Sequence, residues 1–298
     1  MNFSAKRFLG LARDSLLLQN RDRQGADVRQ LFDLHYRLRV DHNGIVASEE
    51  SNAPPIESKA FALLAAGDVS AAVAAITAVA DTQAALETLA QLCQRAYRDL
   101  KSVPIMTAIA WEAVEFGLKC ATASPEPDAS RYRRRARAIA YNAGANCWPG
   151  WGDSVEIKPA DIAEGLKLAE RSYELVGELG LGDKAQGTSL WLLGALQMAA
   201  GQFSMAITQL LRAEEAFQAA QLPVPAAMAR GYVALTEKAL PESHLRGTES
   251  LTTIVGWLRG RESREAQFFA DQLLTADRIF SSPLSQNHAG LKLFGVRQ

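Results

Sequence analysis

The chain has 298 residues, of which 48% are hydrophobic and 22% are charged, and its formal net charge is −1. This length suits one large or two ordinary domains with a substantial core. The near-neutral charge argues against a generic nucleic-acid binder, because a surface that follows phosphates usually appears in the total charge. The three cysteines (Cys93, Cys120 and Cys147) have no close pairs and suggest neither a disulfide framework nor a zinc knuckle. We expect them to be buried thiols.

The first residues do not resemble a targeting segment. Charges interrupt the apolar residues of MNFSAKRFLGLARDSLLLQNRDR, and the stretch has no continuous apolar core followed by a small-residue cleavage site. No uncharged apolar run of about 18 residues occurs anywhere in the chain. We therefore expect a cytoplasmic protein with no membrane partner.

In chain order, residues 1–50 predict an N-terminal helical segment that ends in the polar stretch His42–Pro55. A domain over 51–280 and a tail over 281–298 follow. Residues 82–100 are amphipathic with a helical period, and residues 104–118 are apolar nearly all round, which predicts a helix covered on several sides. Ser124–Asp128 introduces another helix, with Asp128 as a candidate cap.

Two more amphipathic helices are predicted at 160–179 and 203–220. The buried face of the first is expected to carry Ile162, Leu166, Ala169, Tyr173 and Val176. Gly67-Asp68 and Gly201-Gln202 predict tight turns, and residues 250–280 predict two terminal helices. Strand patterns are absent from the sequence, so the predicted fold is all-α.

The stretch WLLGALQMAAGQFSMAITQLLRA (191–213) resembles a tetratricopeptide repeat. Leu193-Gly194 match the first helix of the repeat, Gly201 matches its turn, and Ala206 and Leu210 match its second helix. Weaker copies lie near Gly67, Gly144 and Gly231, so the resemblance covers about 55–240 and is specific only at 187–220. It implies a right-handed α-solenoid of antiparallel helix pairs, with residues 250–280 as capping helices. A generic helical bundle is the alternative.

The same resemblance implies a concave groove, lined by the first helix of each repeat, that holds a partner peptide. By alignment on the Leu-Gly pair, Trp191, Tyr141 and Met228 occupy equivalent groove positions, as do Met198, Trp148 and Leu235. Arg134, Tyr141 and Trp148 are also seven residues apart, which predicts one helical face with Arg137 beside it. The alternative is that these side chains pack between repeats.

The stretch CWPGWGD (147–153) interrupts the repeat. Pro149 predicts that the preceding helix ends at Trp148. Gly144 and its expected counterpart Ile162 are 18 residues apart, against 12 for Gly194 and Ala206, which predicts a six-residue insertion carrying Trp151. Such a loop either carries function or folds back onto the core.

No catalytic motif is recognisable in the sequence, and we predict a protein without enzymatic activity, cofactor or metal. Gly180–Ala185 has the glycine spacing of a dinucleotide fingerprint but follows a predicted helix rather than a strand. Asp33, His35, Asp41 and His42 form the one cluster of histidines and carboxylates, and an exposed polar helix end explains it better than a metal site.

Five arginines crowd the run Arg131–Arg137. Either they form a solvated face paired with acidic neighbours, or they face an anion. The leading hypothesis is a non-enzymatic scaffold that binds a protein or peptide partner. One alternative is a sensor of an anionic small molecule. A second alternative is single-stranded nucleic-acid binding through this run. The predicted binding residues are Arg134, Arg137, Tyr141, Trp148, Trp151, Trp191 and Met198.

Overall fold

A computed structural model describes residues 55–78 and 81–281, and within these residues the fold is all-α, with eleven α-helices and no strand. The chain divides into two units, Met1–Asn52 and Ala53–Gln298, and all described residues belong to the second. The predicted N-terminal segment 1–50 therefore lies outside the described residues, as does the tail beyond Ser281.

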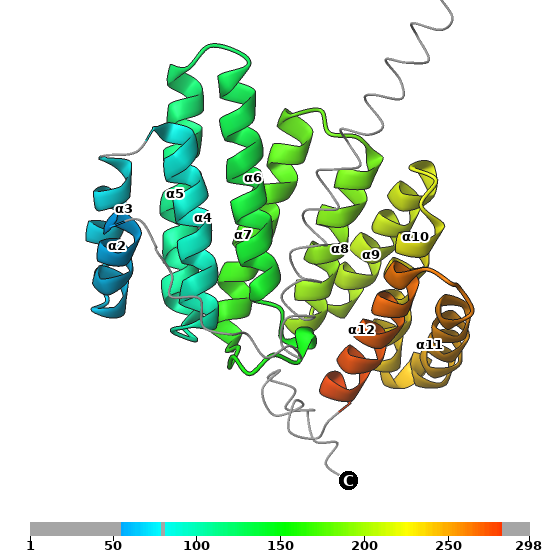
Figure 1. Cartoon of the computed structure of the whole chain (residues 1–298). Coiled ribbons are helices and arrows are strands. Elements are labelled where there is room, and N and C mark those ends of the chain that lie inside the picture. Colours follow the sequence, from blue (N-terminus) through cyan, green and yellow to red (C-terminus); the bar gives the residue numbers. More distant parts are fainter. Residues whose placement is uncertain (1–54, 79–80, 282–298) are drawn as a thin grey trace, which may run out of the picture. The chain divides into compact units, whose positions relative to one another are not determined.

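The helices are packed in chain order, each against the next, which makes the fold solenoid-like (Figure 1). Their bounds are α2 Pro55–Ala65, α3 Val69–Thr77, α4 Thr82–Arg98, α5 Val103–Ala123, α6 Asp128–Asn146, α7 Pro159–Glu178, α8 Asp183–Ala199, α9 Phe203–Ala219, α10 Pro223–Lys238, α11 His244–Arg259 and α12 Arg264–Phe280. Two short 3₁₀ turns, η2 Pro149–Trp151 and η3 Pro241–Ser243, precede α7 and α11. The predicted helices at 82–100, 104–118, 160–179, 203–220 and 250–280 are thus confirmed.

Local side chains explain where several helices begin. The carboxylate of Asp68 accepts a hydrogen bond from the backbone N–H of Ala71 at 2.9 Å, which satisfies one of the free donors at the start of α3. Asp81 caps α4 in the same way. The predicted cap of α6 is wrong: Asp128 is already the first helical residue, and its carboxylate pairs with Arg131 at 3.0 Å.

The helix pair α8–α9 has the close approach expected of the repeat. A Cβ atom added to Gly194 would lie 2.5 Å from Cγ of Leu210 and 3.1 Å from the carbonyl oxygen of Ala206. A Cβ at Gly187 would lie 2.8 Å from the ring of Phe217. The absence of side chains at both glycines allows α9 to lie directly against α8.

The pair α6–α7 has the same design in a different register from the one predicted. The counterpart of Ala206 is Gly165 and not Ile162, because a Cβ on Gly144 would lie 3.0 Å from the carbonyl oxygen of Gly165. Gly165 is 21 residues after Gly144, so the insertion relative to α8–α9 is nine residues rather than six. The buried face of α7 accordingly includes Ser172, whereas two residues predicted to be buried, Leu166 and Tyr173, are half-buried.

Helix α8 is buried on every side from Gly187 to Ala199. This burial means that no part of this stretch lines an open, solvent-filled groove. The last helix, α12, contacts α10, α11 and the η2 turn, so it meets the segment that follows α6 as well as its neighbours in sequence.

Candidate functional site

The candidate site lies where residues 147–158, here called the inserted loop, meet helices α8, α10 and α12. Among the predicted binding residues, Arg134 is exposed and the other six are buried. Trp148, Trp151 and Trp191 come together, and Tyr232 and Phe280 join them. We call these five side chains the aromatic cluster.

The geometry of the inserted loop begins with the end of α6. The helix stops at Asn146, two residues earlier than predicted, and Trp148 has extended backbone angles (φ −89°, ψ 120°). Trp148 is therefore not on the helix, and the prediction that Arg134, Tyr141 and Trp148 share one helical face is wrong. The extended residue carries the Trp148 ring away from the α6 axis and into contact with later helices.

The remainder of the loop folds against the Trp148 ring. A Cβ on Gly150 would lie 2.1 Å from this ring, so only glycine fits there without displacing it. Gly152 has a left-handed backbone (φ 72°), which ends the η2 turn. The Trp151 indole N–H donates to the carbonyl oxygen of Ala145 at 2.7 Å and holds the loop to the end of α6.

The rings of the aromatic cluster are in close contact. The centroid of Trp148 lies 4.9 Å from that of Trp151, in an edge-to-face arrangement, and 5.4 Å from that of Tyr232. Trp191 lies 6.2 Å from Trp148 and 5.4 Å from Tyr232. Phe280, at the end of α12, lies 6.4 Å from Trp148. Such pairs favour one another beyond the area that they bury, by about 0.5–1.5 kcal/mol each.

The indole nitrogen of Trp148 has an unfavourable environment within the cluster. Trp148 is 1% exposed, and its indole nitrogen Nε1 is buried without an acceptor. An unsatisfied buried donor costs about 1–3 kcal/mol. The arrangement therefore combines strong apolar contact with an unfavourable polar group in the same side chain.

The inserted loop is also attached to an earlier helix. The Tyr97 hydroxyl of α4 donates to the carboxylate of Asp153 at 3.0 Å, and Lys101 Nζ donates to Ser154 at 3.3 Å. Burial, together with the neighbouring carboxylate of Asp153, raises the pKa of Tyr97 above its usual value. Burial raises the pKa of the Cys147 thiol as well. The loop thus connects α4 with α12.

Tyr141 and Met198 are buried outside the aromatic cluster, on α6 and α8 respectively. Burial raises the pKa of Tyr141, and the nearby guanidinium of Arg137 opposes that rise. Sequence reasoning missed Tyr232 and Phe280. Tyr232 directly follows Gly231, where the sequence has a weak copy of the repeat, so the repeat pattern could have indicated that Tyr232 is buried. No feature of the sequence around Phe280 indicates its contact with Trp148.

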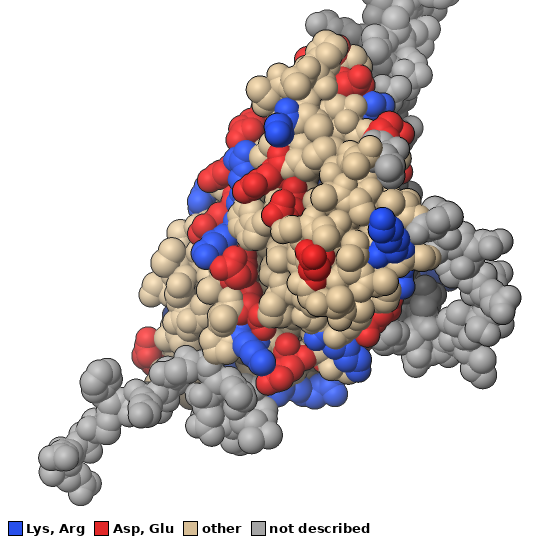
Figure 2. All heavy atoms as spheres, turned by 90° about the vertical axis from the view of Figure 1, so that its left-hand side faces the viewer, with Lys and Arg blue, Asp and Glu red and all other residues tan. Residues whose placement is uncertain are grey.

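The arginine run is divided by the helical period of α6. Arg131 pairs with Asp128 at 3.0 Å, and Arg133 pairs with Glu126 at 3.0 Å. Figure 2 shows acidic and basic side chains intermixed over one face of the molecule. These two ion pairs favour the interpretation of the run as a solvated face that is paired with acidic neighbours.

The other arginines of the run lie in different surroundings. Arg134 is exposed, whereas Arg137 is only 5% exposed. Arg135 is half-buried; burial lowers its pKa, and the carboxylate of Glu87 opposes this effect. The run therefore does not form one continuous cationic surface, which weakens the nucleic-acid alternative.

Gly180–Ala185 and the possible metal ligands are the other chemical candidates in the sequence. Gly180 follows the end of α7 with φ 57°, and α8 begins at Asp183, so Gly180–Gly182 form the turn between two helices and the stretch follows a helix rather than a strand, as predicted. In the part of the chain described, no group of three His, Cys, Asp or Glu side chains could hold a metal ion. Asp33, His35, Asp41 and His42 lie outside the described residues.

In the same part of the chain, no helix is both long and apolar enough to span a bilayer. Comparison with protein families finds no family model that matches the chain, and comparison with curated proteins likewise finds no match.

Proposed function

We propose that the protein is a tetratricopeptide-like interaction module that binds a protein or peptide partner and has no catalytic role of its own. The observation that carries this proposal is the α8–α9 pair. Gly194 lies against Ala206 and Leu210, which are the positions where the repeat pattern of residues 191–213 requires small and large residues to meet. A right-handed solenoid and a cytoplasmic location are part of the same proposal.

The successive packing of helix pairs supports this function, because stacked pairs create extended surfaces suited to another chain. The binding surface requires one refinement. Since Trp148, Trp151, Trp191 and Met198 are buried, a partner reaches them only after a covering element has moved. A partner that binds without such a movement contacts other surfaces of the array.

Affinity capture tests the proposal. The full chain is tagged and used to capture proteins from the source cells, with the tag alone as control, and each protein found by mass spectrometry is purified and titrated by calorimetry. We expect at least one direct, saturable partner. Failure to recover any protein that binds the purified, folded chain would count against an interaction module.

A second measurement separates the ligand-sensor alternative. The purified chain is heated with a panel of anionic metabolites, because a ligand that binds only the folded state raises the melting temperature. A clear rise with one compound, together with an empty capture experiment, would favour the sensor. We expect an unchanged melting temperature across the panel.

A further inference from the structure

Helix α12 contacts α11, α10 and the inserted loop. We call the part of this contact that α10 and the loop contribute, made of Gly231, Lys238, Trp148 and Gly152, the α12-binding surface. Its four residues come from two segments separated by about 80 positions in the sequence. Helix α12 therefore covers residues of both segments.

The apolar contacts follow one side of α12. A Cβ on Gly231 would lie 2.5 Å from Leu273, so Leu273 occupies the space that the glycine leaves open. Phe280, seven residues later, contacts the ring of Trp148. Leu273 and Phe280 are two turns apart on the same face of the helix, as in an amphipathic helix bound in a groove.

The loop contributes a further contact. A Cβ on Gly152 would lie 3.1 Å from Cγ2 of Thr275 and 3.5 Å from Cδ1 of Ile279. The backbone of the inserted loop thus runs directly beside α12.

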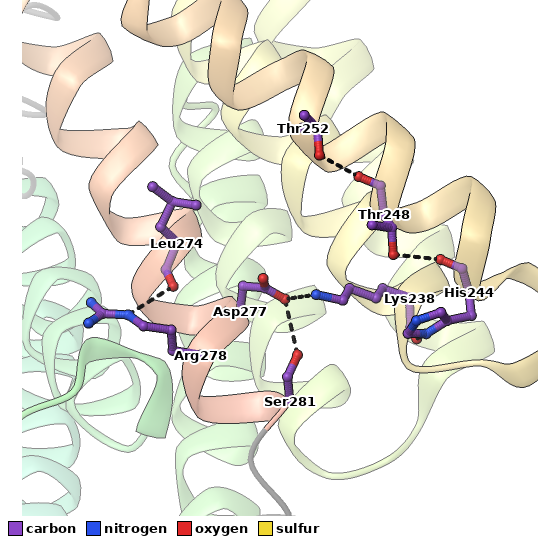
Figure 3. Close-up of polar contacts among 8 residues, drawn as sticks. All are labelled: Lys238, His244, Thr248, Thr252, Leu274, Asp277, Arg278 and Ser281. Atoms are coloured by element: carbon purple, nitrogen blue, oxygen red, sulfur yellow. Dashed lines mark hydrogen bonds and ion pairs between the residues drawn. The ribbon is translucent and has the colours of Figure 1, made fainter.

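A charge pair defines the register of α12. Lys238 Nζ lies 2.6 Å from Oδ1 of Asp277 (Figure 3). The two side chains are only 19% and 23% exposed. Ser281 donates to the same carboxylate oxygen at 3.2 Å. Asp277 is four residues after Leu273 and three before Phe280, so the charge and the two apolar contacts belong to one face.

With α12 in place, two buried polar atoms in this region have no hydrogen-bond partner. The Nε1 atom of Trp148 has no acceptor, and on α12 itself Gln272 is 1% exposed with its Oε1 atom unpartnered. Gln272 lies on α12 itself, so its side chain would regain hydrogen bonds to water if α12 moved away. The closed state therefore includes a polar cost that opposes the apolar contacts.

We propose that α12 is a displaceable helix that occupies the α12-binding surface until an amphipathic helix of a partner protein replaces it. The partner helix carries a large aliphatic residue, a carboxylate four positions later and an aromatic ring after three more, as α12 does with Leu273, Asp277 and Phe280. This inference rests on the proposed function and names the surface and the class of partner.

Displacement makes the affinity depend on how often α12 is open. The apparent dissociation constant equals the intrinsic constant divided by the open fraction. Weakening the attachment of α12 therefore tightens binding of an external helix, and locking α12 abolishes it. A helix that bound elsewhere would respond to neither change.

The experiment uses the full chain and a fluorescent synthetic peptide that copies residues 264–281. Asp277→Lys in the chain places two cations together and opens α12, while Lys238 stays available to the peptide. We expect the peptide to bind this variant at least about tenfold more tightly than the wild type by fluorescence anisotropy. A peptide with Asp277→Lys should lose that gain.

Asp271→Lys is the matched control. It makes the same charge change on the same helix. The Asp271 side chain is 70% exposed, however, and its pair with Arg259 is long, at 3.7 Å. We expect wild-type affinity. Equal gains for Asp271→Lys and Asp277→Lys would overturn the proposal.

A disulfide locks α12 in place. In the Gly152→Cys/Thr275→Cys variant, a Cβ at position 152 would lie 3.1 Å from the Cγ2 atom of Thr275, which brings the two side chains within reach of a bridge between Cβ atoms about 3.8 Å apart. The reduced form carries the same cysteine in the left-handed backbone of position 152 (φ 72°), so it controls for the strain of that substitution. Oxidised protein should not bind the peptide, and reduction should restore binding, with wild-type protein treated identically as control. Equal binding by the oxidised and reduced forms contradicts displacement.

Hydrogen exchange of the unmodified chain gives an answer even if the charge variant does not fold. We expect amides of α12 to exchange through local opening, faster than those of α8 and α9. Exchange of α12 only at the rate of global unfolding would overturn the inference. Peptide binding with no cellular partner would leave displacement intact and contradict only the proposed function.

Discussion

Glycines at helix contacts determine how closely the pairs of this array approach. Gly144 and Gly194 lie against the backbone of the following helix, and Gly231 lies against a side chain of α12. Other helical glycines face open space: a Cβ on Gly256 of α11 would meet no atom within 4 Å. The same residue type thus has opposite energetic consequences at the two kinds of position.

Replacing Gly194 by alanine should lower the free energy of unfolding by about 2 kcal/mol, because the new methyl group would displace Leu210 from a close-packed contact. The matched change Gly256→Ala should raise it by about 0.5–1 kcal/mol through helix propensity alone. Urea denaturation followed by circular dichroism measures both. If both variants were stabilised, the close approach of α8 and α9 would be disproved.

The two tryptophans of the inserted loop should respond differently to replacement by phenylalanine. Trp151→Phe loses the hydrogen bond to Ala145, whereas Trp148→Phe removes a buried donor that has no partner. We expect Trp151→Phe to cost about 1 kcal/mol more than Trp148→Phe. Burial alone predicts the reverse order, since Trp148 is the more buried. Urea midpoints of the two variants distinguish these outcomes.

At the scale of elements, helices were easier to predict than the contacts between them. The α9 helix and its buried Ala206, Leu210 and Phe217 follow from apolar periodicity. The buried face of α7 followed only in part: Ile162, Ala169 and Val176 are buried as predicted, but the face also includes the small residues Gly165 and Ser172. Apolar periodicity counts large residues and does not register such small ones.

The end of α6 shows a second limit of local reasoning. Pro149 predicts that the helix ends no later than Trp148, but it does not specify how much earlier the helix stops. Contacts of the Trp148 ring with α8, α10 and α12 accompany the extended backbone at that residue. The aromatic cluster could not be predicted for the same reason, since Phe280 is 132 residues from Trp148.

The attachment of the inserted loop to α4 should be measurable. Tyr97→Phe removes the hydrogen bond to Asp153 and should lower the free energy of unfolding by about 1–2 kcal/mol. It should also speed amide exchange in the loop. Tyr173→Phe is the control, because its hydroxyl accepts only an exposed bond from Arg212, and it should change stability by less than about 0.5 kcal/mol. Similar effects of the two changes would show that the loop is held by other contacts.

At the scale of the described unit, most contacts join helices that are consecutive or next but one in the chain, whereas the contact between η2 and α12 joins elements that are much farther apart. Nearest-neighbour arrays transmit a local perturbation only to adjacent elements. The loop–α12 contact instead joins segments that are far apart in sequence. The region from α6 to α12 should therefore respond to perturbation as one unit, and α2–α3 should respond separately.

Two buried truncations compare these regions. Ile76→Ala in α3 and Leu273→Ala in α12 each remove a large core side chain, at a cost of about 2–4 kcal/mol. Hydrogen exchange should accelerate in α2–α4 for the first variant, with α8–α12 unchanged. For the second it should accelerate in α12, in α10 and in the inserted loop. If amide exchange in Leu273→Ala accelerated in α12 alone, the contact between α12 and the inserted loop would not stabilise the loop.

The distance in sequence between the inserted loop and α12 also has a consequence during protein synthesis. About 130 residues separate Trp151 from Phe280, which at 5–20 residues per second corresponds to roughly 6–26 seconds of translation. Throughout that interval the growing chain lacks the helix that later covers Trp148. The nascent protein thus presents an apolar surface for many seconds, during which a chaperone or an early-arriving partner has access to residues that the finished fold encloses.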